Sequence, residues 1–116
     1  MTKKLCKDMV NIDNGIRFAG MADRSGKLAA FAYRPGLQPL LTREESELSV
    51  MQSLLRMGMR KTLEEKLGKT IYAFALYEKV KRATIPMDDG ILMVSFDVEA
   101  DHESIILSKI LPMLKS

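Results

Sequence analysis

Hydrophobic and polar positions in the first third of the chain follow a helical period and then strand-like runs. Apolar residues at helical spacing predict a short helix over residues 3–13. Two strands are expected next, at 16–22 and 27–33, because these runs flank Asp23-Arg-Ser-Gly26. That segment has the composition of a tight turn, with glycine where a positive φ is easiest. The pattern therefore predicts a helix followed by a β-hairpin.

A long helix is predicted in the middle of the chain. Thr42 and Glu45 have the spacing of a capping box, in which each side chain binds the other residue's backbone N–H. Gly68 fits the residue that ends a helix. We therefore expect this helix over residues 42–67.

The C-terminal half is predicted to be rich in strands. Branched and aromatic residues predict strands at 69–77, 80–87 and 91–98, and Asp88-Asp-Gly90 is a hairpin turn between the last two. A final helix is expected after the cap residue Asp101. Together the elements predict an α+β fold with a five-stranded antiparallel sheet, one long helix and short N- and C-terminal helices.

The composition fits a single domain over residues 1–116. The chain is 47% hydrophobic and 28% charged, which is ordinary for a chain that builds a core. The single cysteine, Cys6, excludes an intrachain disulfide and favours a reducing compartment. The N-terminus has no signal-peptide pattern, and the longest apolar run, 71–77, is far shorter than a membrane span. We therefore expect a cytoplasmic protein without a membrane partner.

The charge pattern argues against a nucleic-acid partner. The net charge is only +3, and basic and acidic residues are interleaved along the chain. Lys79, Lys81 and Arg82 form the densest basic patch of the β-rich half, and aromatic residues nearby could stack on single-stranded bases. Those aromatic residues are, however, more typical of the interior of a strand.

The long helix carries two apolar stripes, which is one more than a helix covering a small sheet needs. We expect the larger stripe to face the sheet; it consists of Leu48, Met51, Leu55, Met59 and Leu63. The second stripe consists of Val50, Leu54 and Met57. Either the first helix or the loop at 35–39 covers this second stripe, or it contacts a second subunit across a two-fold axis.

The strand expected at 69–77 supports self-association. It is long, apolar and free of proline, and such an edge strand is prone to aggregation unless it is paired. Pairing with its symmetry mate in a homodimer would protect it. The residues predicted to form the dimer or partner interface are Val50, Leu54, Met57, Thr70, Tyr72 and Phe74.

The predicted first hairpin is rich in alanine and glycine. Small side chains there allow a helix to lie close to the sheet, and this is the simpler interpretation. The alternative is that these residues, which include Ala19, Ala22 and Ala30, form the floor of a pocket for a small ligand.

No set of residues predicts catalysis. His102 lies between two acidic residues, but a solvated position in the first turn of the last helix is simpler than a proton shuttle or a metal ligand. Gly68-Lys69-Thr70 matches the end of a phosphate-binding loop, yet the strand follows it where a helix is required. The acidic residues at 97–103 are favourable beside a helix N-terminus without any metal. We expect no catalytic residue, cofactor or metal site.

Two segments and the order of elements resemble the roadblock family. Ile16-Arg-Phe-Ala-Gly-Met-Ala-Asp-Arg-Ser-Gly26 is similar to the family's first strand and glycine turn. Met87-Asp-Asp-Gly-Ile-Leu-Met-Val-Ser-Phe96 is similar to the glycine turn and apolar last strand before the closing helix. The resemblance covers nearly the whole chain and implies a sheet ordered 2-1-5-4-3 with the long helix on one face.

The resemblance also implies a function. Roadblock domains form homodimers or heterodimers by joining sheets edge to edge, and they regulate small GTPases or serve as adaptors. It therefore implies a non-catalytic dimeric adaptor or regulator, with a small GTPase or another protein as partner. Profilin, longin and PAS-like domains share related layouts, so a PAS-like sensor of a small ligand is the alternative.

Overall fold

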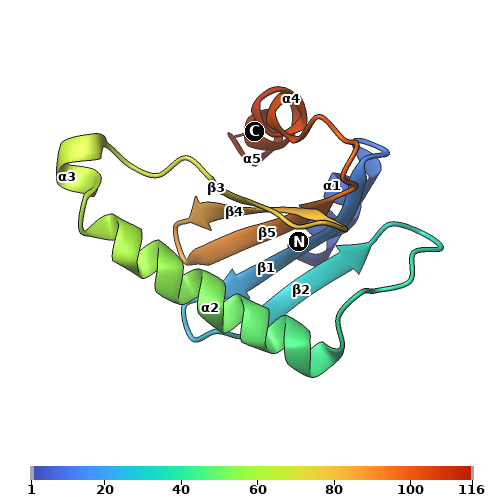
Figure 1. Ribbon diagram of the computed structural model, residues 1–116, viewed down its shortest axis with the longest axis horizontal. Helices are drawn as coiled ribbons and strands as arrows, with labels where there is room; N and C mark the ends of the chain where they lie inside the picture. Colours follow the sequence, from blue (N-terminus) through green and yellow to red (C-terminus); the bar gives the residue numbers. More distant parts are fainter. Residues whose placement is uncertain (1, 116) are drawn as a thin grey trace.

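The computed structural model describes residues 2–115, which form one antiparallel sheet with helices on both faces (Figure 1). The strands are ordered β2-β1-β5-β4-β3. This confirms the predicted α+β class and strand order. The elements are α1 (Thr2–Asn11), β1 (Ile16–Asp23), β2 (Leu28–Tyr33), α2 (Arg43–Lys61), α3 (Glu64–Leu67), β3 (Ala73–Leu76), β4 (Lys81–Met87), β5 (Gly90–Phe96), α4 (His102–Ile105), a π-helical turn (Ile106–Ile110) and α5 (Leu111–Lys115).

Both predicted hairpin turns are present. The Asp23 carboxylate accepts hydrogen bonds from the backbone N–H groups of Ser25 (2.9 Å) and Lys27 (3.2 Å), and Gly26 has a φ of +91°. Gly90 follows the second turn with a φ of +155°, and a Cβ there would collide with the backbone of Ala22. These local signals were sufficient to predict where the strands reverse.

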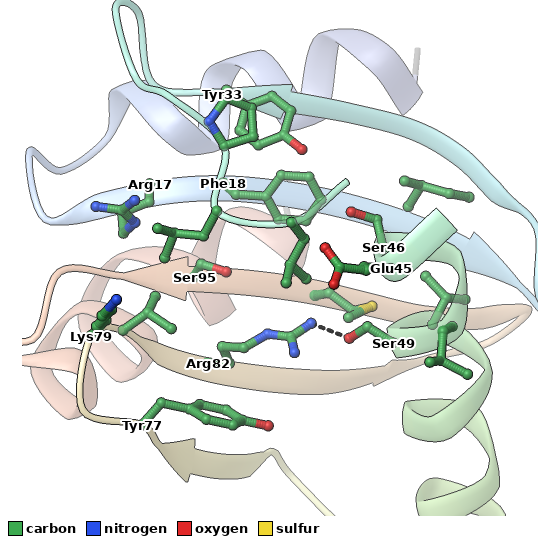
Figure 2. A pocket seen from close by; sticks show the side chains of 18 of the residues that line it. Arg17, Phe18, Tyr33, Glu45, Ser46, Ser49, Tyr77, Lys79, Arg82 and Ser95 are labelled. Carbon is green, nitrogen blue, oxygen red and sulfur yellow. Dashed lines mark hydrogen bonds between the residues drawn. The ribbon is translucent and has the colours of Figure 1, made fainter. Parts of the chain in front are cut away.

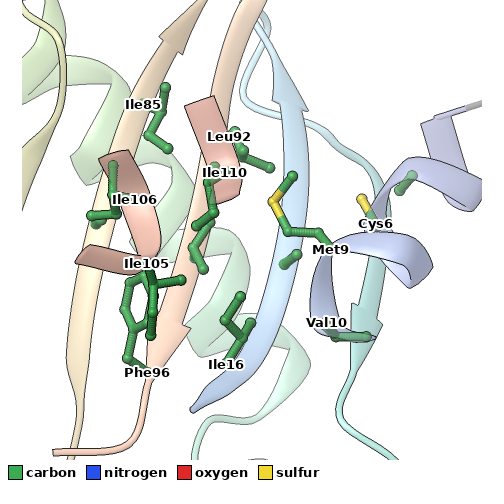
Figure 3. Close-up of a cluster of buried hydrophobic side chains, with 14 residues drawn as sticks. Cys6, Met9, Val10, Ile16, Ile85, Leu92, Phe96, Ile105, Ile106 and Ile110 are labelled. Carbon is green, nitrogen blue, oxygen red and sulfur yellow. The ribbon is translucent and has the colours of Figure 1, made fainter. Parts of the chain in front are cut away.

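The larger core lies between the sheet and the terminal helices (Figure 3). Phe96 of β5 and Ile106 of the C-terminal helical region are completely buried there. On α1, Cys6 and Met9 are completely buried, and burial raises the pKa of the Cys6 thiol. The buried members are Cys6, Met9, Val10, Ile16, Ala19, Ala30, Ala83, Ile85, Leu92, Val94, Phe96, Ile105, Ile106 and Ile110.

The C-terminal helical region begins as predicted and then departs from α geometry. The side chain of Asp101 caps it by accepting a hydrogen bond from the N–H of Ser104 at 3.2 Å. Further on, the N–H of Leu111 donates to the carbonyl of Ile106, five residues back. Pro112 has no N–H to donate, so the backbone before it widens into a π turn.

The long helix is shorter than predicted. Its capping box is present, since Glu45 N–H donates to Thr42 Oγ1 (3.1 Å) and Thr42 N–H donates to Glu45 Oε1 (2.9 Å). However, α2 ends at Lys61, and a separate turn of helix, α3, follows after Leu63. Gly68, with a φ of +88°, ends α3 rather than α2.

The third strand is also shorter than predicted. Residues 69–72 are not in a strand, and β3 pairs with β4 over Ala73–Leu76 only. The N–H of Thr70 donates instead to a carboxylate oxygen of Glu64 at 3.1 Å. This side-chain bond competes with strand pairing and delays the start of β3. A short edge strand is one way in which proteins limit aggregation.

None of the helices within residues 2–115 is long and apolar enough to cross a membrane.

Asp97 forms ion pairs that connect the ends of three strands. Its carboxylate accepts two bonds from Arg34, at 2.7 and 3.2 Å, and one from Arg17 at 3.2 Å. Arg34 follows β2, Arg17 belongs to β1, and Asp97 follows β5. The Arg34 guanidinium, with help from Arg17, holds the pKa of the Asp97 carboxyl below its usual range.

This cluster predicts a contribution to acid stability. Because the pKa of Asp97 is lower in the folded state, its stabilisation is complete above the unfolded-state value of about 3.9 and is lost as the pH falls further. Asp97→Asn should lower the free energy of unfolding at pH 7 by about 1 kcal/mol, since the cluster is partly exposed. Below about pH 4, the variant should also lose less stability than wild type as the pH falls.

Urea unfolding at a series of pH values tests this prediction. Glu99→Gln is the control, because Glu99 is exposed and has no hydrogen bond or ion pair among residues 2–115. Equal acid sensitivity of wild type and Asp97→Asn would contradict the assigned role.

Candidate functional site

The long helix faces the sheet with the opposite side from the one predicted. Val50 is 1% exposed and Met57 is 4% exposed, and both pack with Ile91 and Met93 of β5 in a second, smaller core. Leu54 is half-buried beside them. The prediction that these three side chains contact a partner is therefore wrong for Val50 and Met57, which their own sheet covers.

The chemistry of the sheet explains the reversal. The helix also buries Ser49 and Ser53 against the sheet. Beneath the helix the sheet presents polar as well as apolar residues, and Arg82 of β4 donates a hydrogen bond to Ser49 Oγ. A helix face that contains serines satisfies this mixed surface better than a stripe of leucine and methionine would.

The larger apolar stripe of α2 is consequently exposed to solvent. Its members are 49–71% exposed, and we call them the exposed stripe; they are Leu48, Met51, Leu55, Met59 and Leu63. Leu67 on α3 and Ile71 beyond it are exposed as well. A contiguous row of large apolar side chains outside the core is typical of an interaction surface.

The predicted edge-strand residues lie near the far end of this helix but do not form one surface. Thr70 and Tyr72 are half-buried before the strand, and Tyr72 packs against the larger core. Phe74, on β3, stacks on the ring of His102 with a centroid distance of 3.8 Å and an interplanar angle of 9°. Their part in an interface stays a prediction.

His102 is not the solvated residue that the sequence suggested. Its ring is half-buried against Phe74, and its Nδ1 has no hydrogen-bond partner among the described residues. Burial, and then the positive charge of Lys81, lower the pKa of His102. Residues 2–115 contain no group of three potential metal ligands.

A groove of about 450 Å³ opens between the first half of α2 and the sheet (Figure 2). We call it the α2 groove. One row of paired residues crosses its floor, from Tyr33 on β2 through Phe18 and Ser95 to Arg82 on β4. The row is aromatic at one end and cationic at the other, and Arg82 points across the groove toward Ser49.

Two further walls complete the α2 groove. Leu37, Pro39, Leu40 and Leu41 come from the loop between β2 and α2, and Tyr77, Lys79 and Val80 come from the turn before β4. The loop is thus part of a groove that sequence reasoning did not identify. A signal was present, because Leu40 and Leu41 are apolar residues in a segment otherwise rich in proline and glycine.

Two surfaces that the sequence leaves as less favoured alternatives are not assembled. The alanine-rich hairpin is not a pocket floor, because Ala19 and Ala30 pack in the larger core and Ala22 packs under α2. The basic patch is also divided. Arg82 lines the α2 groove, whereas Lys81 points to the other face and donates to the carbonyl of residue 100 at 2.6 Å.

The comparisons with known proteins agree with this fold. No family model and no curated protein sequence matches the chain. Among solved structures, MglB of Myxococcus xanthus superposes with a TM-score of 0.76 at 14% identity, covering 98% of this chain and 89% of that one.

Two other solved structures widen the comparison. A Roadblock/LC7 domain from Streptomyces avermitilis gives a TM-score of 0.68 at 10% identity, covering 98% of both chains. Profilin of Schizosaccharomyces pombe gives 0.64 at 10% identity, covering 96% and 93%. The chain therefore has the Roadblock/LC7 fold, whose layout profilin shares.

The orientation of α2 predicts a large effect on stability for one methionine of the helix and almost none for another. Met57→Ala should lower the free energy of unfolding by about 2–3 kcal/mol, because it leaves a cavity against the sheet. Met59→Ala should change it by less than about 0.5 kcal/mol, because that side chain is exposed. Urea unfolding at low micromolar protein concentration measures both. Reversed values would show that the exposed stripe, not Met57, faces the sheet.

Proposed function

We propose that this chain is a non-catalytic adaptor or regulator that acts as a homodimer. The observation that carries the proposal is the exposed stripe on α2, which its own sheet does not cover. The Roadblock/LC7 fold supports it as an analogy, because the sequence resemblance implies dimers and protein partners. Protein binding is thus proposed from the surface of this chain as well as from its fold.

The exposed stripe is a better interface than the one predicted from the sequence. In the proposed dimer, two copies of the exposed stripe pack together, through Leu48, Met51, Leu55 and Met59 of α2 and through Leu63 just beyond its end. The free edge of β3 supplies unpaired backbone groups near the end of this surface. Thr70, Tyr72 and Phe74 would then lie beside the joined edges rather than at the centre of the interface.

The energetics favour a dimer of moderate affinity. Each half-exposed side chain of the stripe would contribute about 1 kcal/mol when a second copy covers it. The stripes of two copies together only match the cost of association, roughly 4–15 kcal/mol. Pairing of the β3 edges would therefore be needed for a stable complex. We expect a dissociation constant of the dimer in the micromolar range.

The proposed partner class is a small GTPase. This step rests on the resemblance to roadblock domains. A purified candidate GTPase, tested for binding to wild type and to a monomeric variant, would distinguish a role that requires the dimer from one that does not.

Sedimentation equilibrium tests the dimer directly. Leu55→Asp places a charge at the centre of the exposed stripe and should weaken association by at least about tenfold, because an unpaired charge would be buried. Its free energy of unfolding as a monomer should be nearly unchanged, since Leu55 is exposed.

Leu107→Asp is the matched control. Leu107 is also about half exposed, at 49%, but it lies on the C-terminal helical region, which covers the other face of the sheet. It should leave association unchanged. A wild-type chain that remains monomeric at several hundred micromolar would refute the proposal, as would equal weakening by both variants.

A further inference from the structure

We propose that the α2 groove binds a small molecule with a flat apolar body and one carboxylate group. This goes beyond the proposed function, because the site lies within a single protomer and does not depend on self-association. Its volume of about 450 Å³ falls within the range of roughly 300–1,000 Å³ typical of small-molecule sites.

The apolar body is matched by one end of the α2 groove. Phe18 and Tyr33 lie side by side there, with ring centroids 5.0 Å apart. Leu28 and Leu37 extend the same wall. Gly20 makes this arrangement possible, because a Cβ at that position would collide with the ring of Phe18. Aromatic and aliphatic walls of this kind favour a planar apolar group.

The carboxylate is matched by Arg82 at the other end. This side chain is half-buried, and its hydrogen-bond partner is the uncharged hydroxyl of Ser49. No carboxylate within residues 2–115 pairs with Arg82. Arg17, which also lines the α2 groove, is by contrast paired with Asp97. A guanidinium has five N–H donors, so Arg82 retains the capacity to bind a carboxylate in a bidentate manner.

The other charges of the α2 groove also favour an anion. Glu45 is the acidic residue of its lining, and its carboxylate is engaged in the capping box by the N–H of Thr42. Lys79 adds a positive charge from the turn before β4. Arg82 and Lys79 have no carboxylate partner within residues 2–115 and outweigh the single carboxylate of the lining, so the α2 groove attracts an anion more than a cation.

The spacing limits the size of the ligand. Phe18 and Arg82 are two strands apart, across Ser95 of β5. Neighbouring strands are separated by about 4.8 Å, which places the aromatic and cationic ends roughly 10 Å apart. A two-ring aromatic carboxylate has this length.

Calorimetric titration with 2-naphthoate tests the site, and 2-naphthamide is the uncharged probe of the same shape. Wild type should bind the carboxylate about tenfold more tightly than the amide, because a charge-assisted hydrogen bond is added. Arg82→Gln should abolish this preference. Lys61→Gln, which removes a cation from the exposed end of α2 outside the groove, should retain it.

Further measurements keep the test decisive. Arg82→Lys retains the positive charge but lacks the five-donor fork, so it should reduce the preference, and it is the informative variant if Arg82→Gln does not fold. Ser49→Ala retains the guanidinium and should keep the preference. Amide chemical-shift changes should centre on residues 18, 37 and 95. Equal binding of both probes, or shifts confined to the exposed stripe, would overturn the proposal.

The test is separate from that of the dimer. Leu55→Asp does not alter the lining of the α2 groove and should bind 2-naphthoate as wild type does. Loss of 2-naphthoate binding on self-association would instead show that a second copy occupies the α2 groove, and would overturn the small-molecule assignment.

Discussion

The sheet has two chemically different faces, and the rest of the structure depends on this difference. Leu92, Val94 and Phe96 of β5 point to one face, whereas Ile91 and Met93 point to the other, and all five side chains are buried. The first face is apolar across most of its width and is covered by the helices at both ends of the chain. The second face is mixed: it is apolar in its middle, where α2 crosses it, aromatic on β1 and β2, and polar at Arg82 and Ser95.

The position of α2 follows from this mixed character. Val50 and Met57 pack on the apolar middle of the face, and the buried serines beside them face polar residues such as Arg82. The bulkier stripe then remains in solvent, and the polar row with Arg82 is left only partly covered. The exposed stripe and the α2 groove therefore have the same physical origin.

Local signals in the sequence predicted the elements, but they did not predict how the long helix packs. The capping box at Thr42 and the turns at Gly26 and Gly90 depend on residues close in the chain, and each is present. The strand order was implied by the resemblance to the roadblock family and not by periodicity. The predicted orientation of the helix is wrong, because its larger apolar stripe favours burial on size alone, whereas the facing sheet is partly polar.

A signal for the correct orientation was nevertheless present in β4. Arg82 and Thr84 alternate with Ala83 and Ile85, so one face of this strand is polar and the other apolar. Matching that polar face to the serine-containing side of the helix would have given the observed packing. The short β3 could not be predicted in this way, because it depends on a bond between Glu64 and a backbone N–H six residues later.

The two proposed surfaces are physically connected through one residue. Leu48 belongs to the exposed stripe and also lines the α2 groove. Leu48 is one of twenty residues that line the α2 groove, so a second copy on the stripe would leave most of the lining unchanged. Association through the stripe and ligand binding in the α2 groove are therefore expected to be nearly independent, although the two surfaces share one side chain.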